Sequence, residues 1–167
     1  HAFLSPDSKK MLSVSDNYRA VLWDLPHAKI IGKLEGHSNL IMDACFSPDG
    51  EKVATASWDG SAIIWNSTSG NILHKISGIA KMMQCLAFSP DSRFLLTCGT
   101  IGTSVKMNLW NSSNGILYKQ FLQDNGHTAN ILNAAFSPDG NWIATSSTNN
   151  TAIIWEVATG MISAVVQ

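Results

Sequence analysis

The chain has 167 residues, a formal net charge of −1 and only 14% charged residues, against roughly a quarter in a typical globular protein. Lysines and arginines do not cluster, so the basic stripe that neutralises phosphates is missing and direct binding of nucleic acid is not expected. No apolar run approaches the roughly 20 residues that span a bilayer, and no membrane contact is expected.

The titratable side chains offer no metal or redox motif. Three cysteines lie inside apolar runs, without Cys-x-x-Cys spacing: Cys45, Cys85 and Cys98. Such a set is typical of reduced core thiols in a cytoplasmic or nuclear protein. Three histidines stand alone, without a partner at ligand spacing: His1, His27 and His74. We therefore expect no metal and no cofactor.

From the amino terminus onward, the chain copies one unit four times. A Ser-Pro-Asp tripeptide recurs with its proline at Pro6, Pro48, Pro90 and Pro138, at intervals of 42, 42 and 48 residues. A tryptophan follows each proline by 17, 17, 20 and 17 residues, so the third unit contains an insertion. The units cover approximately 1–35, 36–77, 78–122 and 123–167, and a repeat of this length is typical of solenoids and propellers.

Each unit contains four short β-favouring runs separated by turn residues. In the second unit these are about 41–47, 52–57, 61–66 and 72–76, which predicts one four-stranded antiparallel sheet. The third run, Ala62-Ile63-Ile64-Trp65, is apolar at successive positions, which indicates that both faces are covered. Sheets stacked radially as blades meet that need. We predict an all-β propeller with four consecutive blades. We expect a larger closed propeller, with the missing blades supplied in cis or by another chain.

The motifs of the second unit carry a family resemblance. They are Gly-His at 36–37, Phe-Ser-Pro-Asp-Gly at 46–50, Ala-Thr-Ala-Ser-Trp-Asp-Gly at 54–60 and Ile-Ile-Trp at 63–65. With a period near 42 they resemble the WD-repeat family, and the likeness covers essentially the whole chain. That family ties each blade together with a hydrogen-bonded tetrad. The resemblance implies the tetrad His37, Ser57, Asp59 and Trp65.

The other units depart from this pattern. The fourth has an amide in place of the carboxylate, and its implied set is His127, Ser147, Asn149 and Trp155. The first offers Ser15, Asn17 and Trp23. The third offers Ile79, Gly99 and Trp110, so we expect that blade to keep only the tryptophan and to be held mainly by packing.

The resemblance implies a non-catalytic scaffold that binds other proteins. Residues 33–37 and 45–50 are also similar to the WD-repeat part of SOCS-box substrate receptors, which makes a substrate-recognition module of a cullin-type ubiquitin ligase an alternative. A propeller enzyme is a third interpretation, because Ser57, His37 and Asp59 are the residue types of a hydrolase triad. Against it, Ser57 should be buried, and no carboxylate pair, phosphate loop or cofactor motif appears.

Two kinds of connection should meet at one edge of the blades: the hairpins between middle strands and the loops between successive blades. That edge is predicted to carry Tyr18, Arg19, Trp58, Met82, Ile101 and Asn130. Trp58 breaks the register of the repeated tryptophans, so it is either an interface anchor or a residue packed on the adjacent loop. Trp142 also breaks register and is expected at the opposite rim.

Overall fold

The computed structural model describes residues 1–15, 18–78, 80–102, 104–121 and 126–166, and these residues form β-strands joined by turns and loops. The strands make four antiparallel sheets of four strands each, as the repeat predicts. The all-β propeller architecture is therefore confirmed. Within the described ranges there is no helix long and apolar enough to cross a membrane.

The strands follow one another through four blades. Blade 1 contains β1 (Ala2–Leu4), β2 (Lys10–Val14), β3 (Ala20–Asp24) and β4 (Lys29–Leu34). Blade 2 contains β5 (Ile41–Phe46), β6 (Lys52–Ser57), β7 (Ala62–Asn66) and β8 (Ile72–Ile76). Blade 3 contains β9 (Met82–Phe88), β10 (Phe94–Ile101), β11 (Ser104–Asn111) and β12 (Leu117–Phe121). Blade 4 contains β13 (Ile131–Phe136), β14 (Trp142–Ser147), β15 (Ala152–Glu156) and β16 (Ile162–Val166).

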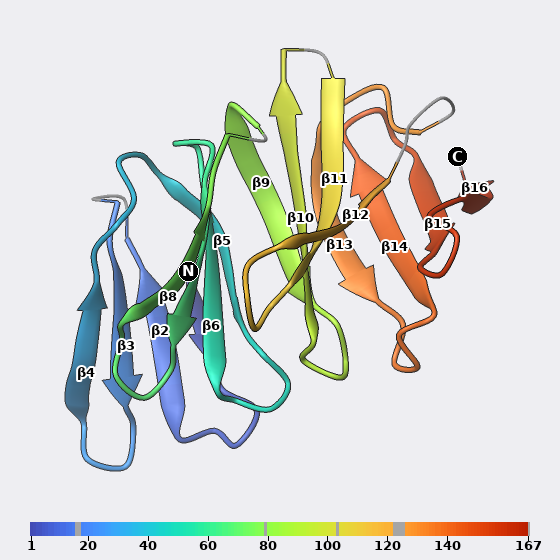
Figure 1. Ribbon diagram of the computed structural model, residues 1–167. Coiled ribbons are helices and arrows are strands. Elements are labelled where there is room, and N and C mark those ends of the chain that lie inside the picture. Colours follow the sequence, from blue (N-terminus) through green and yellow to red (C-terminus); the bar gives the residue numbers. More distant parts are fainter. Residues whose placement is uncertain (16–17, 79, 103, 122–125, 167) are drawn as a thin grey trace.

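The blades stand side by side in an arc, with blade 1 and blade 4 at its two ends (Figure 1). Within each blade the strands are paired in chain order. The first strands of successive blades contact one another, β1 with β5, β5 with β9 and β9 with β13. The hairpins between second and third strands share one edge with the connections between blades, and we call it the upper edge. The Ser-Pro-Asp turns occupy the lower edge.

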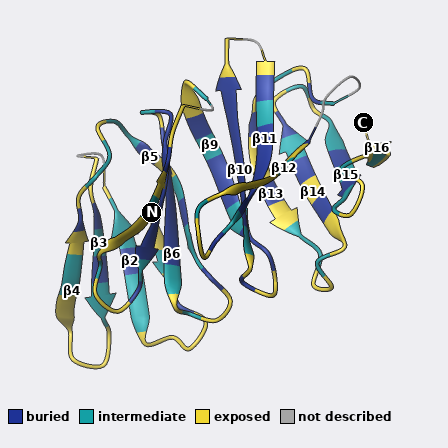
Figure 2. Cartoon of the chain, in the orientation of Figure 1, coloured by how far each residue is buried: buried dark blue, intermediate teal, exposed yellow. Residues whose placement is uncertain are grey.

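The core consists of three layers, each between two neighbouring blades (Figure 2). Between blades 1 and 2, for example, Leu12 and Leu22 pack against Val53, Ile63 and Trp65. Alternate residues of a strand therefore face different blades. Because both faces of the inner blades are covered, their strands are apolar at successive positions.

The recurring Ser-Pro-Asp sequence forms the same turn in every blade. In blade 2 the Ser47 hydroxyl donates to Asp49 Oδ1 at 2.5 Å and accepts from the Lys52 backbone N–H at 2.9 Å. Equivalent bonds form around Ser5, Ser89 and Ser137. Proline supplies the fixed φ of the turn, which explains why the tripeptide punctuates the repeat.

Candidate protein-interaction face

A buried hydrogen-bond network supports the upper edge of blade 2. The His37 side chain is fully buried, with Nδ1 3.0 Å from Asp59 Oδ2 and Nε2 2.8 Å from Thr55 Oγ1. The Trp65 indole N–H donates to the same Thr55 oxygen at 2.9 Å. Every partner is satisfied when the Thr55 hydroxyl donates to His37 Nε2 and His37 Nδ1–H donates to Asp59. This network connects the loop that precedes β5 with strands β6 and β7 and with the hairpin between them.

The Asp59 carboxylate closes the hairpin and also holds the incoming loop. Oδ1 accepts from the backbone N–H and hydroxyl of Ser61, at 2.9 and 2.6 Å, and Oδ2 accepts from the Ser38 N–H at 2.9 Å. Partial burial opposes ionisation, but these hydrogen bonds and that from His37 outweigh it and hold the pKa of Asp59 at about 2. Burial lowers the pKa of His37 despite the neighbouring carboxylate. The pair is therefore a carboxylate and a neutral imidazole near pH 7.

The hydroxyl of this network belongs to Thr55, and the expectation for Ser57 was wrong. The Ser57 hydroxyl donates to the Asn39 carbonyl at 3.1 Å and accepts from the Asp59 N–H at 3.0 Å. Ser57 therefore braces the loop and the hairpin and does not pair with Trp65. Ser57 is fully buried, and the His37 imidazole is hydrogen-bonded to Thr55 instead. Ser57 is therefore not placed as a nucleophile beside His37.

Blade 4 repeats the arrangement of blade 2, with Thr151 at the position of Ser61, whose hydroxyl lies 3.1 Å from His37 Nδ1. His127 Nε2 lies 2.8 Å from Thr145 Oγ1, which accepts the Trp155 N–H at 2.8 Å, so the expectation for Ser147 was wrong as well. The Ser147 hydroxyl instead donates to the Ala129 carbonyl at 3.1 Å.

Asn149 reaches this histidine only indirectly. The Thr151 hydroxyl lies 2.9 Å from His127 Nδ1 and donates to Asn149 Oδ1 at 2.6 Å. Asn149 Nδ2 donates to the Thr128 hydroxyl at 3.1 Å, which ties the incoming loop to the hairpin. An amide thus replaces the carboxylate with Thr151 as the bridge.

Blades 1 and 3 keep the tryptophan–hydroxyl pair. Trp23 donates to Ser13 Oγ at 2.8 Å, and Trp110 donates to Thr97 Oγ1 at 2.9 Å. The expected positions Ser15 and Gly99 were therefore wrong, and blade 3 retains more than its tryptophan. Asn17 and Ile79 lie outside the described residues. A signal existed in the sequence, because the position seven residues after the repeated proline has a hydroxyl in all four units, whereas the position nine residues after it has Gly99 in the third unit.

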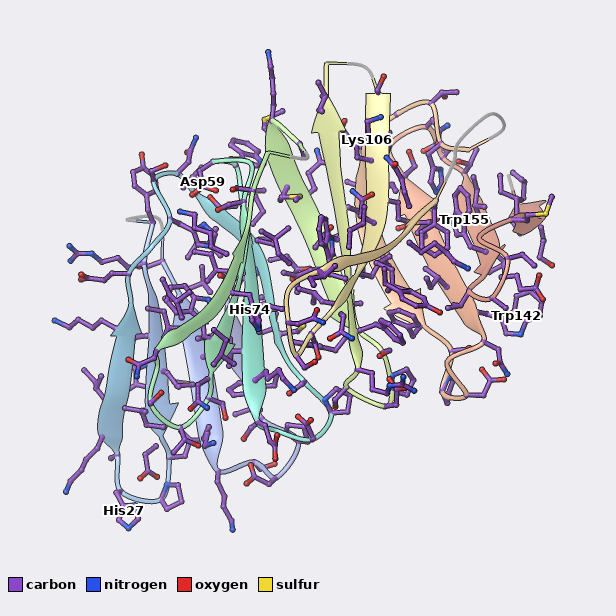
Figure 3. All side chains as sticks on the ribbon, viewed as in Figure 1. His27, Asp59, His74, Lys106, Trp142 and Trp155 are labelled. Carbon is purple, nitrogen blue, oxygen red and sulfur yellow. The ribbon has the colours of Figure 1, made fainter. Side chains whose placement is uncertain are left out.

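The six residues expected at the upper edge all lie there and are exposed: Tyr18, Arg19, Trp58, Met82, Ile101 and Asn130. Figure 3 shows Asp59 at this edge and His27 at the opposite one. Arg19 Nε lies 3.5 Å from Glu35 Oε1, an ion pair that bridges the β2–β3 hairpin and the loop after β4. The longer β10–β11 hairpin carries Ile101. The loop before blade 4 is also longer by sequence than the other connections between blades, and its residues Gln123–Asn125 lie outside the described residues.

Trp58 is held from both sides. Its backbone N–H donates to the Leu40 carbonyl at 2.9 Å, and its neighbours Ser57 and Asp59 are bonded to the same loop. The side chain remains 37% exposed. The network therefore presents an indole from a fixed backbone.

Among the described residues, no three His, Cys, Asp or Glu side chains are grouped closely enough to hold a metal ion. His27 bonds Asp24 at 2.8 Å, and His74 Nε2 lies 2.9 Å from the Ser113 carbonyl on the next blade. Both histidines thus have local structural partners.

Stacked four-stranded blades, each with a tryptophan bonded to a strand hydroxyl, define a repeat-built β-propeller. The family model described as WD domain, G-beta repeat matches residues 28–66, 70–107 and 118–156. The chain therefore belongs to the WD-repeat family, whose repeats generally mediate protein–protein interaction. Each matched segment starts in or next to the outermost strand of one blade and extends into the third strand of the next. No curated protein matched the chain.

Proposed function

We propose that this chain is a non-catalytic scaffold that binds a partner protein on its upper edge, with Trp58 as the central anchor. The observation that carries the proposal is the exposed indole on a hairpin whose backbone and flanking side chains are all hydrogen-bonded. Such a side chain loses little conformational freedom on binding, so less of the free energy gained from its contacts is offset by lost entropy.

The upper edge that carries Trp58 has the composition of an interface core. Tyr18, Arg19 and Met82 are residue types enriched where proteins meet, and Ile101 adds apolar area. A mixed aromatic, apolar and cationic surface suits a protein better than a sugar or a phosphate. Residues 33–37 and 45–50 form the connection between blades and the β5–β6 turn, which belong to the repeat itself. They therefore do not favour a ubiquitin-ligase role over other scaffolds.

The thiols support a reducing compartment, the cytoplasm or the nucleus. Cys85 and Cys98 are directly opposite each other on β9 and β10, yet both are free. The hydrogen bond with the Cys85 thiol, together with burial, keeps the pKa of Cys98 well above its ordinary value, so Cys98 is not disposed to oxidise.

Two tryptophans of almost equal exposure provide a matched test. Trp58 is 37% exposed on the upper edge and Trp142 is 38% exposed at the lower edge. Partners captured from cell extract by the unsubstituted chain should be lost with Trp58→Ala and retained with Trp142→Ala. With a purified partner, Trp58→Ala should weaken binding about 30-fold or more, as for an anchor worth about 2 kcal/mol. Equal binding by both variants, with unchanged melting temperatures, would move the site away from the upper edge.

A further inference from the structure

A recess lies on the lower edge, between blades 3 and 4. It has a volume of about 380 Å³, and its walls are Phe94 and Pro90 from blade 3 and Phe136, Pro138 and Val157 from blade 4. Phe94, Phe136 and Val157 also pack on the core between these blades, which fixes them in place. Both walls belong to covered faces of neighbouring blades, so the recess does not depend on the open ends of the arc.

The junction between blades 3 and 4 differs from the other two junctions in the residues that face each other across it. Five residues after the serine of each turn, blades 1 and 2 have Lys10 and Lys52, whereas blade 3 has Phe94. Between blades 1 and 2 the Lys10 ammonium crosses the junction and donates to the Ser67 hydroxyl at 2.9 Å.

The serine facing that lysine is also replaced. Two residues after the repeated tryptophan, blades 2 and 3 have Ser67 and Ser112, whose hydroxyls donate to the Gly50 and Ser92 carbonyls at 2.5 and 2.6 Å. Blade 4 has Val157 there. The polar pair Lys10–Ser67 between blades 1 and 2 thus corresponds to the apolar pair Phe94–Val157 between blades 3 and 4. This replacement leaves an apolar recess.

Two carboxylates border the recess. The Ser137 hydroxyl and the Asn141 N–H lower the pKa of Asp139, and the Ser89 and Arg93 groups lower that of Asp91 against slight burial. Both side chains are therefore ionised near pH 7. The bonds to Asp91 all use Oδ1. Two cations lie nearby: Arg93 sits over the Phe94 ring at 5.5 Å, and the Lys119 ammonium is held by the carbonyls of Val157 and Ala158.

We propose that this recess binds a linear peptide segment of a partner protein. One leucine or aromatic side chain of the segment would enter between Phe94, Phe136 and Val157, and an adjacent lysine or arginine would pair with Asp91 or Asp139. The volume is at the lower end of ligand sites, enough for one or two side chains and too small for most cofactors. Exposed Tyr118, whose ring lies 4.6 Å from that of Phe94, extends the apolar surface outward.

This site lies on the opposite edge from Trp58 and goes beyond the scaffold function proposed above. A library of random 12-residue peptides displayed on phage, selected on the full chain, provides the probe. The enriched sequences should share a leucine or aromatic residue within about three positions of a lysine or arginine. Their dissociation constants are then measured by fluorescence anisotropy with synthetic peptides.

The deciding variant copies the junction between blades 1 and 2. Phe94→Lys combined with Val157→Ser should fold, because the same pair of residues is present in the chain, and it should weaken the peptides about 30-fold. Asp91→Asn with Asp139→Asn keeps the turn bonds and should weaken them about two- to fivefold, as expected for exposed ion pairs. Trp58→Ala should have no effect.

Any of the following results would overturn the proposal. One is the absence of any consensus, and another is an acidic or purely apolar consensus. The third is a set of peptides that still bind the Phe94→Lys, Val157→Ser variant or the double asparagine variant with full affinity. Peptides lost with Trp58→Ala alone would support the upper edge and count against the recess. Circular dichroism melting of each variant separates lost binding from lost folding.

Discussion

Thr55 is the residue on which the polar core of blade 2 depends. Its hydroxyl both donates to His37 and accepts from Trp65, so one side chain satisfies two buried rings. The sheet register explains the choice. Val53 pairs with Trp65 and Thr55 with Ile63, so Thr55 is the diagonal neighbour of the tryptophan. Ser57 lies two residues further along β6, about 7 Å away at the rise of a strand.

Removing this hydroxyl should cost more than removing its neighbour. Thr55→Val preserves shape but leaves His37 Nε2 and the Trp65 N–H without partners, so we expect a loss of roughly 2 to 4 kcal/mol in unfolding free energy. Ser57→Ala removes only loop contacts and should cost about 1 kcal/mol. Urea unfolding followed by tryptophan fluorescence measures both. The opposite order would show that Ser57 is the main partner after all.

The same network makes stability depend on pH. Burial lowers the pKa of His37 and of His127 below the ordinary 6.5. Just below pH 6.5 the unfolded chain therefore binds protons at these histidines that the folded chain does not bind. Stability from these histidines is complete above that value and declines as pH falls below it. Asp59 adds a second decline between its ordinary 3.8 and about 2. Half-buried Asp43, whose pKa is raised by desolvation, acts in the opposite sense.

Melting temperatures measured from about pH 7 to about pH 5 test the histidine step. The unsubstituted chain should lose stability over that interval, while the double variant His37→Gln, His127→Gln should show a flatter profile from a lower starting value. An unsubstituted chain with a flat profile would contradict neutral, buried imidazoles.

The sequence indicated His37, Asp59 and Trp65 but not which hydroxyl joins them. Both Thr55 and Ser57 are small hydroxyl residues on the same face of one strand, so composition could not separate them. The register of β6 against β7 separates them, and register depends on the exact hairpin closed at Asp59 and Gly60. The signal that would have sufficed is the third unit, which keeps a hydroxyl at Thr97 but has Gly99 at the position that matches Ser57.

Among the elements, the β6–β7 hairpin also touches the next blade. Gly60 has φ +81°, and a Cβ built on it would lie 2.5 Å from the Ala80 carbonyl oxygen in the connection to blade 3. Glycine is required there for two reasons, the left-handed backbone and the close approach of another chain segment. The turn that displays Trp58 is therefore fixed by the neighbouring blade as well as by its own.

Gly78 provides a control with the same backbone and no neighbour. Its φ is +80°, and nothing lies within 4 Å of a built Cβ. Gly78→Ala should cost about 1 kcal/mol from strain alone, and Gly60→Ala should cost more by roughly 1 to 3 kcal/mol because blade 3 must shift. Thermal unfolding of the two variants measures the difference. Equal losses would mean that the loop around Ala80 yields freely.

The strands themselves could be predicted closely, because turn residues mark both ends of each run. The predicted run 52–57 is the observed β6 (Lys52–Ser57), and 72–76 is β8 (Ile72–Ile76). The recess between blades 3 and 4 could not be predicted in this way. It depends on Phe94 and Val157 meeting across a junction, although the sequence places them 63 positions apart (157 − 94).

At the scale of the whole molecule, the exposure of equivalent residues in different blades shows which blade faces are covered. Ala54 and Ile64 of blade 2 are fully buried by blade 3, whereas Ala144 and Ile154, at the same positions of blade 4, are exposed and half-buried. At the other end of the arc Trp23 is half-buried, while Trp65 is 1% exposed. The two end faces thus present apolar sheet that the inner blades cover.

We therefore expect the 167-residue chain to self-associate at micromolar concentration, since a soluble monomer rarely leaves such faces open. Ala144→Lys places a charge on the open face and should reduce association, measured by light scattering, without lowering the melting temperature. Ala54→Lys buries the same charge between blades 2 and 3 and should unfold the protein, at a cost of about 4 kcal/mol or more. A monodisperse monomer from the unsubstituted chain would show that the end faces are tolerated. If it also melted in one sharp transition, each end blade would have to be held by its single neighbour alone.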